Sequence, residues 1–245
     1  MASLSLHLLA SRSAGAAENM AIDYLLLQRY PEASHPRLRH YGWHRPAITF
    51  GYSQKFEEVR ALCPDSDVPL EKCRRFSGGG IVDHRDDWTY ALVIPRGHPL
   101  EKVRAQESYR VVHEALAGAL RSLGQAAETK KECDPPTEGS GKTRRPPGLC
   151  FSHPECFDVI DPDSGRKIAG AAQKRNKHGL LLQGSLWRPS APQVRDWDSL
   201  LDAFAARLGQ ALETEPSSVP WPEFNEDEQS QLTEVYSSSE WNEQR

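Results

Sequence analysis

The segment CRRFSGGGIVDHRDDWTYALVIPR, residues 73–96, carries the features that decide the fold. It places a glycine triplet, 78–80, between the basic pair Arg74 and Arg75 and the strand-like apolar run 88–94. Successive glycines let a backbone approach a ligand closely and aim its N–H groups at an anion or a carbonyl. The segment therefore predicts a turn that can cradle an acyl or phosphate group. A glycine-rich hairpin turn beside two solvated arginines is the alternative.

A second segment, GRKIAGAAQKR at 165–175, places Lys167 directly after a tight turn. The small residues at 169–172 leave space for a substrate chain, and the lysine is suited to hold or activate a carbonyl. The alternative is an edge-strand lysine that protects against aggregation.

Periodicity elsewhere predicts a helix, a strand–turn–strand hairpin, a second helix and a mobile surface loop, followed by three strands and two more helices. In that order these elements are 17–30, 38–54, 103–123, 125–148, 149–160, 167–175, 179–187, 197–213 and 223–235. This pattern favours an α+β fold with mixed, largely antiparallel sheets flanked by helices, in a single domain over 1–245.

Composition narrows the class of protein. A net charge of −4 over 245 residues gives no general attraction to nucleic acid or anionic membranes. No apolar run approaches the roughly 20 residues that span a bilayer, and the Leu-rich start has no basic region before it. Five cysteines, an odd number in a long chain, are expected to be reduced thiols. We expect a cytoplasmic protein with no metal site.

Taken together, RRFSGGGIVDH, GRKIAGAAQKR and GLLLQGSL resemble the lipoate–protein ligase and octanoyltransferase family, within the biotin/lipoate protein ligase superfamily. The resemblance extends from ENMAIDYLLL through YGWHRPAITFGYSQ to the P-x-F-x-E region near the C-terminus, so it covers most of the chain. It implies the fold of that catalytic domain, with a tunnel for a lipoyl or octanoyl chain.

Carried onto matching positions, the resemblance implies that Lys167 lies at the reactive carbonyl. The residues that it implies around the substrate are Arg74, Arg75, Ser77, Gly78, Gly79, Gly80, His84, Gly170 and Ala171.

Cysteine placement separates a transferase from a ligase, because a thiolate near a cation attacks thioesters well. The stretch LCFSHPECFDVI at 149–160 resembles the one in which the LipM-like octanoyltransferases hold their nucleophile, which implies Cys150 as the nucleophile. Cys156 falls where that pattern has a packing residue. Leu149 and the longer turn DPDSG depart from the pattern.

The resemblance thus implies transfer of an octanoyl group from acyl carrier protein, through Cys150, to one lysine of a lipoyl domain. That domain belongs to a 2-oxoacid dehydrogenase E2 or to the glycine cleavage H protein. Lys167 would stabilise the oxyanion and, if burial lowers its pKa, help to deprotonate the incoming lysine. No cofactor is expected.

Three alternatives stay open. An ATP-dependent lipoate–protein ligase would need ATP and Mg²⁺, but long ligases carry a further C-terminal domain, and only about 60 residues follow LLQGSL here. A lipoyl or octanoyl amidotransferase between carrier proteins is the second, and a non-catalytic acyl-binding module is the third. A biotin ligase would show a GRGRxGR-like loop, which this chain lacks.

Overall fold

The computed structural model describes residues 4–28, 35–64, 69–132, 151 and 153–245. Within these residues a larger sheet has eight strands in the order β11-β1-β2-β6-β10-β9-β8-β7. In chain order they are β1 (Ser5–Ala14), β2 (Arg37–Trp43), β6 (Asp87–Pro95), β7 (Glu128–Thr129), β8 (Val159–Ile160), β9 (Lys167–Asn176), β10 (Gly179–Trp187) and β11 (Glu215–Val219).

A smaller sheet has the described strands β3 (Ala47–Phe50), β4 (Glu71–Arg74) and β5 (Ile81–Asp83), with β3 in the middle. The described helices are α1 (Ala16–Gln28), α2 (Phe56–Leu62), α3 (Pro99–Lys102), α4 (Ala105–Ser122), α5 (Asp198–Leu212), α6 (Glu226–Ser237) and α7 (Ser239–Asn242), with a 3₁₀ turn, η1 (Arg188–Ser190).

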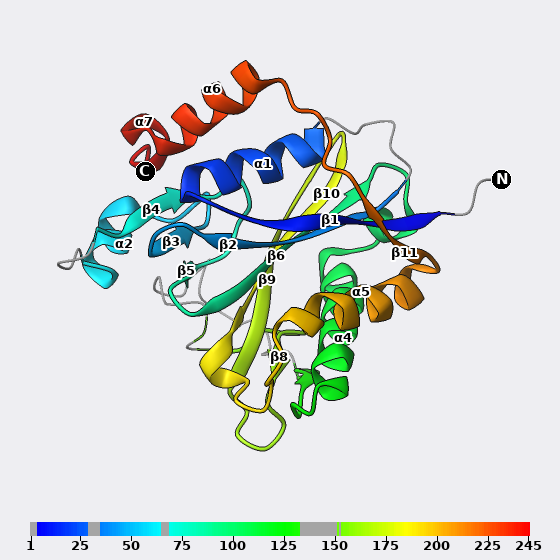
Figure 1. The fold of residues 1–245 in the computed structure, drawn as a ribbon. Coiled ribbons are helices and arrows are strands. Elements are labelled where there is room, and N and C mark those ends of the chain that lie inside the picture. Colours follow the sequence, from blue (N-terminus) through cyan, green and yellow to red (C-terminus); the bar gives the residue numbers. More distant parts are fainter. Residues whose placement is uncertain (1–3, 29–34, 65–68, 133–150, 152) are drawn as a thin grey trace.

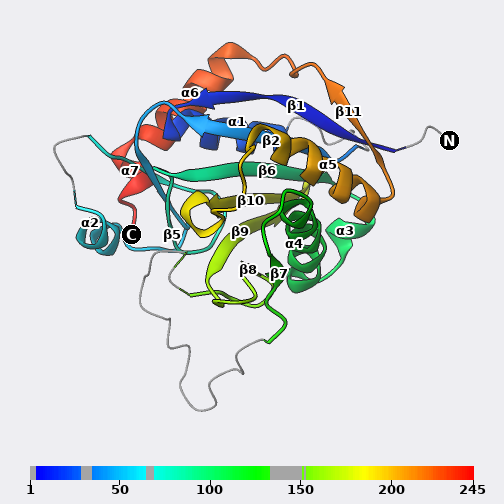
Figure 2. The same cartoon turned by 60° about the horizontal axis from the view of Figure 1, so that its bottom comes forward.

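The larger sheet is covered by helices on both faces (Figures 1 and 2). Helices α4 and α5 pack on one face and share a core with apolar side chains of β6 and β10. Helix α1 packs on the other face, and α6 lies over α1. Because both faces are covered, every residue of β6 is buried, which explains why 87–95 is nearly continuously apolar.

The expected fold class is confirmed. Most pairs in the larger sheet are antiparallel, whereas β1 runs parallel to both β2 and β11. The helices expected at 17–30, 103–123, 197–213 and 223–235 correspond to α1, α4, α5 and α6.

The hairpin expected over 38–54 is wrong, although both of its strands form. Strand β2 pairs with β1 and β6, whereas β3 turns away into the smaller sheet and pairs with β4 and β5. All four residues of β3 are buried, so this strand is central to its own sheet. A short apolar run bounded by a proline does not reveal which sheet it joins.

The region before Lys167 also differs from the expectation. Only Val159 and Ile160 of the strand expected over 149–160 are in a strand, and the other described residues of that segment lie in turns, a bend or irregular structure. The loop expected over 125–148 begins with β7, which pairs with β8; its remainder, 133–148, lies outside the described residues.

The glycine triplet lies in the connection from β4 to β5, beside the end of β3. The N–H of Gly51 donates to the carbonyl of Gly80 at 3.1 Å, and that of Tyr52 donates to Ser77 at 2.9 Å. A Cβ on Gly51 would stand 2.1 Å from the Gly79 oxygen, so this approach requires a glycine. The smaller sheet thereby holds the glycine loop against the larger one.

Candidate active site

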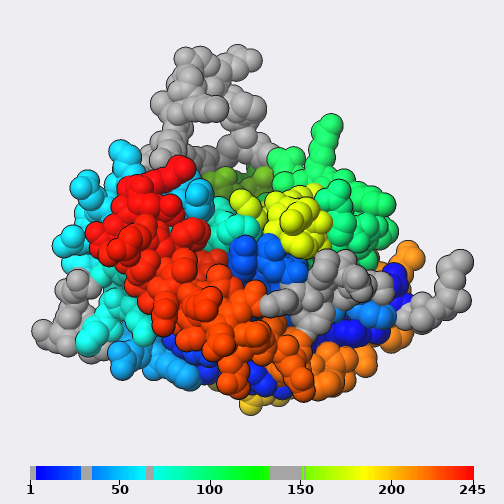
Figure 3. All heavy atoms as spheres, turned by 90° about the horizontal axis from the view of Figure 1, so that it is seen from above, coloured from blue at the N-terminus to red at the C-terminus, as the bar shows by residue number. Residues whose placement is uncertain are grey.

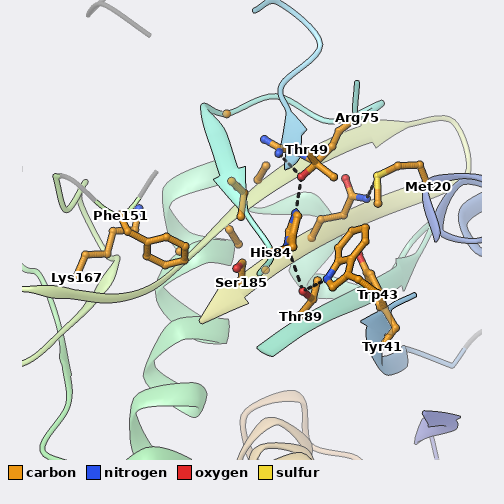
Figure 4. Close-up of a pocket in the computed structure, with 17 residues that line it drawn as sticks. Met20, Tyr41, Trp43, Thr49, Arg75, His84, Thr89, Phe151, Lys167 and Ser185 are labelled. Carbon is orange, nitrogen blue, oxygen red and sulfur yellow. Dashed lines mark hydrogen bonds between the residues drawn. The ribbon is translucent and has the colours of Figure 1, made fainter. Parts of the chain in front are cut away.

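A pocket lies where the glycine loop meets β9 and β10 (Figure 4). It contains about 460 Å³ of empty space, part of it open to solvent. The described lining residues are Met20, Tyr41, Trp43, Thr49, Arg75, Gly79, Val82, His84, Thr89, Phe151, Lys167, Gly170, Ala171, Ala172, Gln183, Gly184 and Ser185. Figure 4 shows Lys167 and Phe151 at one end and Met20, Trp43 and Tyr41 at the other.

Lys167 is the first residue of β9 and is buried at one end of this pocket. Its Nζ lies 2.6 Å from Oδ2 of Asp158, and both side chains are less than 10% exposed, at 5% and 8%. A buried charge is stable only when it is paired, and this carboxylate supplies the partner. The pair places an ammonium group at the pocket, able to donate to an oxygen that gains negative charge.

Asp158 is itself fixed by its surroundings. Its Oδ2 accepts the N–H of Glu155 at 2.6 Å, and its own N–H donates to the Glu155 carbonyl. The preceding Phe157 has a φ of 65°, which turns the chain tightly, and its carbonyl lies 2.7 Å from Nδ1 of the buried His113 on α4. Asp158 therefore holds Lys167 from a turn that several hydrogen bonds define.

Gly170 leaves room for this ion pair. A Cβ at Gly170 would stand 2.6 Å from both Cε and Nζ of Lys167 and 2.9 Å from Oδ1 of Asp158. Any larger residue would displace the lysine. The small residues that the sequence places on this strand thus accommodate the lysine as well as a ligand.

Arg75 shapes the glycine loop from inside the protein. Its guanidinium donates to the carbonyls of Gly78 and Gly80, both at 2.9 Å, and to the Thr49 hydroxyl at 2.8 Å. Gly79 lines the pocket with a φ of 89°, a conformation that favours glycine. The basic residue is therefore part of the loop's scaffold, with its side chain also facing the pocket.

Ser77 is completely buried and anchors the loop to the larger sheet. Its hydroxyl donates to Oε1 of Gln183 at 2.5 Å, and Nε2 of Gln183 donates to the carboxylate of Asp23 on α1 at 2.7 Å. Asp23 in turn forms a buried ion pair with Arg39 at 2.7 Å. This chain of bonds connects the glycine loop to β10, α1 and β2.

His84 lines the pocket at the centre of a polar network. Its Nε2 lies 2.7 Å from the Thr49 hydroxyl, and its Nδ1 lies 2.7 Å from Oδ2 of Asp87. Burial alone would raise the pKa of Asp87, but His84 and the hydroxyls of Ser185 and Thr89 outweigh it, so the pKa is lowered. The His84 ring also stacks on Trp43, with centroids 4.0 Å apart.

Arg74 does not line the pocket with its neighbour; it is fully buried and holds the C-terminal segment. Its guanidinium donates to the carbonyls of Tyr52, Gln54, Trp241 and Asn242. The C-terminal residues, in orange and red in Figure 3, spread across one face of the molecule beside α1.

The implied nucleophile, Cys150, lies outside the described residues, whereas the next residue, Phe151, lines the pocket with Lys167. Cys63 and Cys73 are buried free thiols, and burial raises the pKa of Cys73 to about 12. Neither of these two is suited to be a thiolate nucleophile. Cys156 is disulfide-bonded, so the prediction of five reduced thiols is wrong for this residue. Spacing along the chain did not reveal that pairing.

Of the residues implied around the substrate, the structure brings Arg75, Gly79, His84, Gly170 and Ala171 to the pocket with Lys167. Sequence reasoning missed Asp158, the partner of Lys167, and several residues that line the pocket, Gln183 among them. Asp158 is the acidic residue of CFDVI, so its place in that stretch was a usable signal.

The part of the chain that the structure describes contains no group of three or more His, Cys, Asp or Glu side chains arranged to hold a metal ion. None of the described helices combines the length and apolar character needed to cross a bilayer.

Comparison with known proteins gives a consistent match. The model of the lipoyl protein ligase A/B catalytic domain matches residues 15–197. Octanoyltransferase LipM of Bacillus cereus is 33% identical over 191 residues, which are 77% of this chain and 65% of that protein. The LipM of Exiguobacterium sp. is 34% identical, covering 81% of this chain and 70% of its own length. The chain therefore spans about two thirds of the length of these relatives.

Solved structures share the fold. A Thermoplasma acidophilum protein with bound lipoic acid has a TM-score of 0.72 at 20% sequence identity. The match covers 99% of this chain and 100% of the chain of that protein. A lipoate-protein ligase A bound with ATP has a TM-score of 0.71 at 19% identity, covering 98% of each chain.

Proposed function

The chain belongs to the lipoyl protein ligase A/B catalytic domain family, and we propose that it is an octanoyltransferase acting in protein lipoylation. In this proposal it takes an octanoyl group from a thioester on acyl carrier protein and attaches it to one lysine of a lipoyl carrier domain. The observation that carries the proposal is the buried Lys167–Asp158 pair at the end of a pocket built from the glycine loop. The similarity to LipM octanoyltransferases supports the choice of acyl group.

The pocket suits an acyl chain. Met20, Trp43, Ala172 and Val82 provide apolar surface, and Gly79 lets the backbone approach the chain closely. With the acyl chain lying toward Met20, its carbonyl comes to the end at which Lys167 and Phe151 lie (Figure 4).

The first step is thioester exchange. The Cys150 thiolate attacks the carbonyl carbon, a new carbon–sulfur bond forms, and the donor's carbon–sulfur bond breaks. The donor leaves as a thiolate and takes up a proton. The ammonium of Lys167, fixed by Asp158, supports this step by donating to the carbonyl oxygen as negative charge develops.

The second step forms the amide. The neutral amine of the carrier lysine attacks octanoyl-Cys150, the nitrogen loses a proton, and the Cys150 sulfur departs and accepts one. The tight pairing with Asp158 favours an electrostatic role for Lys167 over the role of general base. The thioester supplies the free energy of both steps, so the proposed reaction consumes no ATP and needs no cofactor.

The proposed partners are octanoyl acyl carrier protein as donor and, as acceptor, the lipoyl domain of a 2-oxoacid dehydrogenase E2 or the glycine cleavage H protein. A cytoplasmic location is part of the proposal.

The test offers the purified protein an apo lipoyl domain with one of three donors: octanoyl acyl carrier protein, free octanoate with ATP and Mg²⁺, or an octanoylated H protein. We expect modification of the lipoyl domain from octanoyl acyl carrier protein without ATP, detected by intact mass. Modification only from the free acid with ATP would identify a ligase instead. Modification only from the octanoylated H protein would identify an amidotransferase.

A further inference from the structure

A second cavity adjoins the acyl pocket at Lys167. It contains about 610 Å³ of empty space, part of it open to solvent, and Phe151 and Lys167 line both cavities. Its other walls include Arg166, Trp187 and Ser190, none of which lines the acyl pocket. Lys167 therefore stands at a junction between two spaces.

The shape of a thioester connects these spaces. Its carbonyl carbon bears the acyl chain on one side and the sulfur with the donor's chain on the other. If the carbonyl lies at Lys167 and the acyl chain fills the first pocket, the donor's chain must leave through another opening. The second cavity offers such an opening, because it adjoins Lys167 and shares none of the walls near Met20.

The walls of the second cavity fit a narrow chain of methylene and amide groups. Trp187 ends β10 and its ring lies 5.8 Å from that of Phe151, which gives two aromatic surfaces for methylene groups. Ser190, in η1, brings a hydroxyl that can bond an amide. The exposed Arg166 adds a positive charge at the rim.

We propose that this second cavity, lined by Arg166, Trp187 and Ser190, is the binding subsite for the pantetheine arm of the thioester donor. The inference rests on the proposed octanoyl transfer and names where the donor's leaving group binds. Release of the arm after the first step vacates the cavity, which then admits the acceptor lysine to the same carbonyl. One opening thus serves the donor thiol and the acceptor amine in turn.

The experiment compares octanoyl-pantetheine with octanoyl methyl thioester, which presents the same acyl group without the arm. Thiol release is followed with an excess of apo lipoyl domain. The variant Ser190→Leu fills the second cavity, and the matched variant Ala172→Leu fills the acyl pocket. Ser190 lines only the second of these two cavities, and Ala172 lines only the acyl pocket. Trp187→Ala removes a wall without adding bulk, as a second variant in case Ser190→Leu does not fold.

We expect the ratio of kcat/KM for octanoyl-pantetheine to that for the methyl thioester to fall about tenfold in Ser190→Leu and in Trp187→Ala. In Ala172→Leu the kcat/KM values for the two thioesters should fall by the same factor, so that their ratio stays unchanged. Octanoyl-coenzyme A and octanoyl acyl carrier protein both carry the pantetheine arm, so their kcat/KM relative to the methyl thioester should fall by the same factor. Whichever of the two the wild-type protein uses with the higher kcat/KM is identified as the source of the arm.

An unchanged ratio in folded Ser190→Leu and Trp187→Ala would overturn the subsite while leaving octanoyl transfer intact. If the wild-type protein transfers from no thioester at all, the proposed function fails, and the subsite fails with it.

Discussion

The glycines of this site differ in how strongly the structure requires them, although the sequence gives no sign of the difference. Gly78 has open space around the position of a Cβ, whereas Gly79 has a positive φ and close neighbours. Gly170 is the most restricted of the three, because a side chain there would meet Lys167. A glycine in a motif is therefore required only where a close approach or a left-handed conformation demands it.

Gly170→Ala should abolish most of the activity while the protein stays folded. The added methyl group must push aside the Lys167 ammonium, and loss of one oxyanion donor costs about 10²–10³ in kcat. The matched control is Gly78→Ala, which should stay within about twofold of wild type. Octanoyl transfer and thermal unfolding measured on both variants check this, and equal activity in the two would contradict the assigned role of Gly170.

The residues that carry chemistry were predictable only as part of a resemblance. Lys167 alone fitted an edge-strand lysine better than a functional one, and the place of Asp158 in CFDVI could mark it as an acidic site residue but not as the partner of Lys167. That pairing depends on β8 and β9 lying side by side, with the turn at Phe157 aiming the carboxylate. The sequence does not show that this turn and strand pairing bring the two side chains together.

At the scale of elements, helix α4 supports the site through His113. This side chain is 1% exposed and bonds the Phe157 carbonyl next to Asp158. Burial lowers the pKa of His113 below 6.5, with Lys167 acting in the same direction, although Asp158 and the bond to Phe157 oppose the shift. The folded protein therefore keeps this histidine neutral at a pH where the unfolded chain begins to protonate it.

The stability of the protein should consequently decrease as the pH falls below 6.5. Above that pH His113 is neutral in both states and contributes no pH dependence. Below it the unfolded state binds the extra proton, so the free energy of unfolding falls by up to about 1.4 kcal/mol per pH unit. Urea unfolding at pH values of about 7.5 and about 5.5 should show a smaller loss in His113→Asn than in wild type. Equal losses of unfolding free energy in the two proteins would contradict this role of His113. The pKa values of His7, His40 and His98 are also lowered, but these residues are present in both proteins and do not affect the comparison.

Helix α7 fixes the strand that leads into the glycine loop. Asn242 accepts the N–H of Arg74 at 2.7 Å and donates to the carbonyls of Tyr236 and Ser238, both at 2.9 Å. Trp241 donates its indole N–H to the Arg74 carbonyl at 2.8 Å. The C-terminal helices therefore stabilise a loop that is about 170 residues earlier in the chain.

Asn242→Ala should reduce the free energy of unfolding by about 1–3 kcal/mol, because the Arg74 N–H and the carbonyls of Tyr236 and Ser238 all lose this hydrogen-bond partner. It should also raise the KM for the acyl donor, since the glycine loop loses its support. The exposed Glu240 on the same helix offers the control variant Glu240→Ala, which should change neither quantity. If both variants behave alike in urea unfolding and in donor titrations, α7 has no part in positioning the loop.

Elements were easier to predict than their pairing. The helices followed from apolar spacing, but the hairpin expected over 38–54 failed because β2 and β3 join different sheets. Trp43 and Thr49 thus come from different sheets and line the same pocket.

For the whole molecule, two sheets and their helices create one junction at Lys167, where the pocket proposed for the acyl chain adjoins a second cavity. The α+β class was predictable from the order of strands and helices. The junction was not, because it arises where the smaller sheet meets β9 and β10. The central claim is that an octanoyl thioester reacts at this junction through Cys150.

The most direct test incubates the wild-type protein and Cys150→Ala with octanoyl acyl carrier protein, in the absence of a lipoyl domain, and measures intact mass. The account predicts one octanoyl group on the wild-type protein, released by an apo lipoyl domain, and none on Cys150→Ala. An adduct of the same extent on Cys150→Ala, or no adduct on a wild-type protein that still modifies the lipoyl domain, would contradict the account.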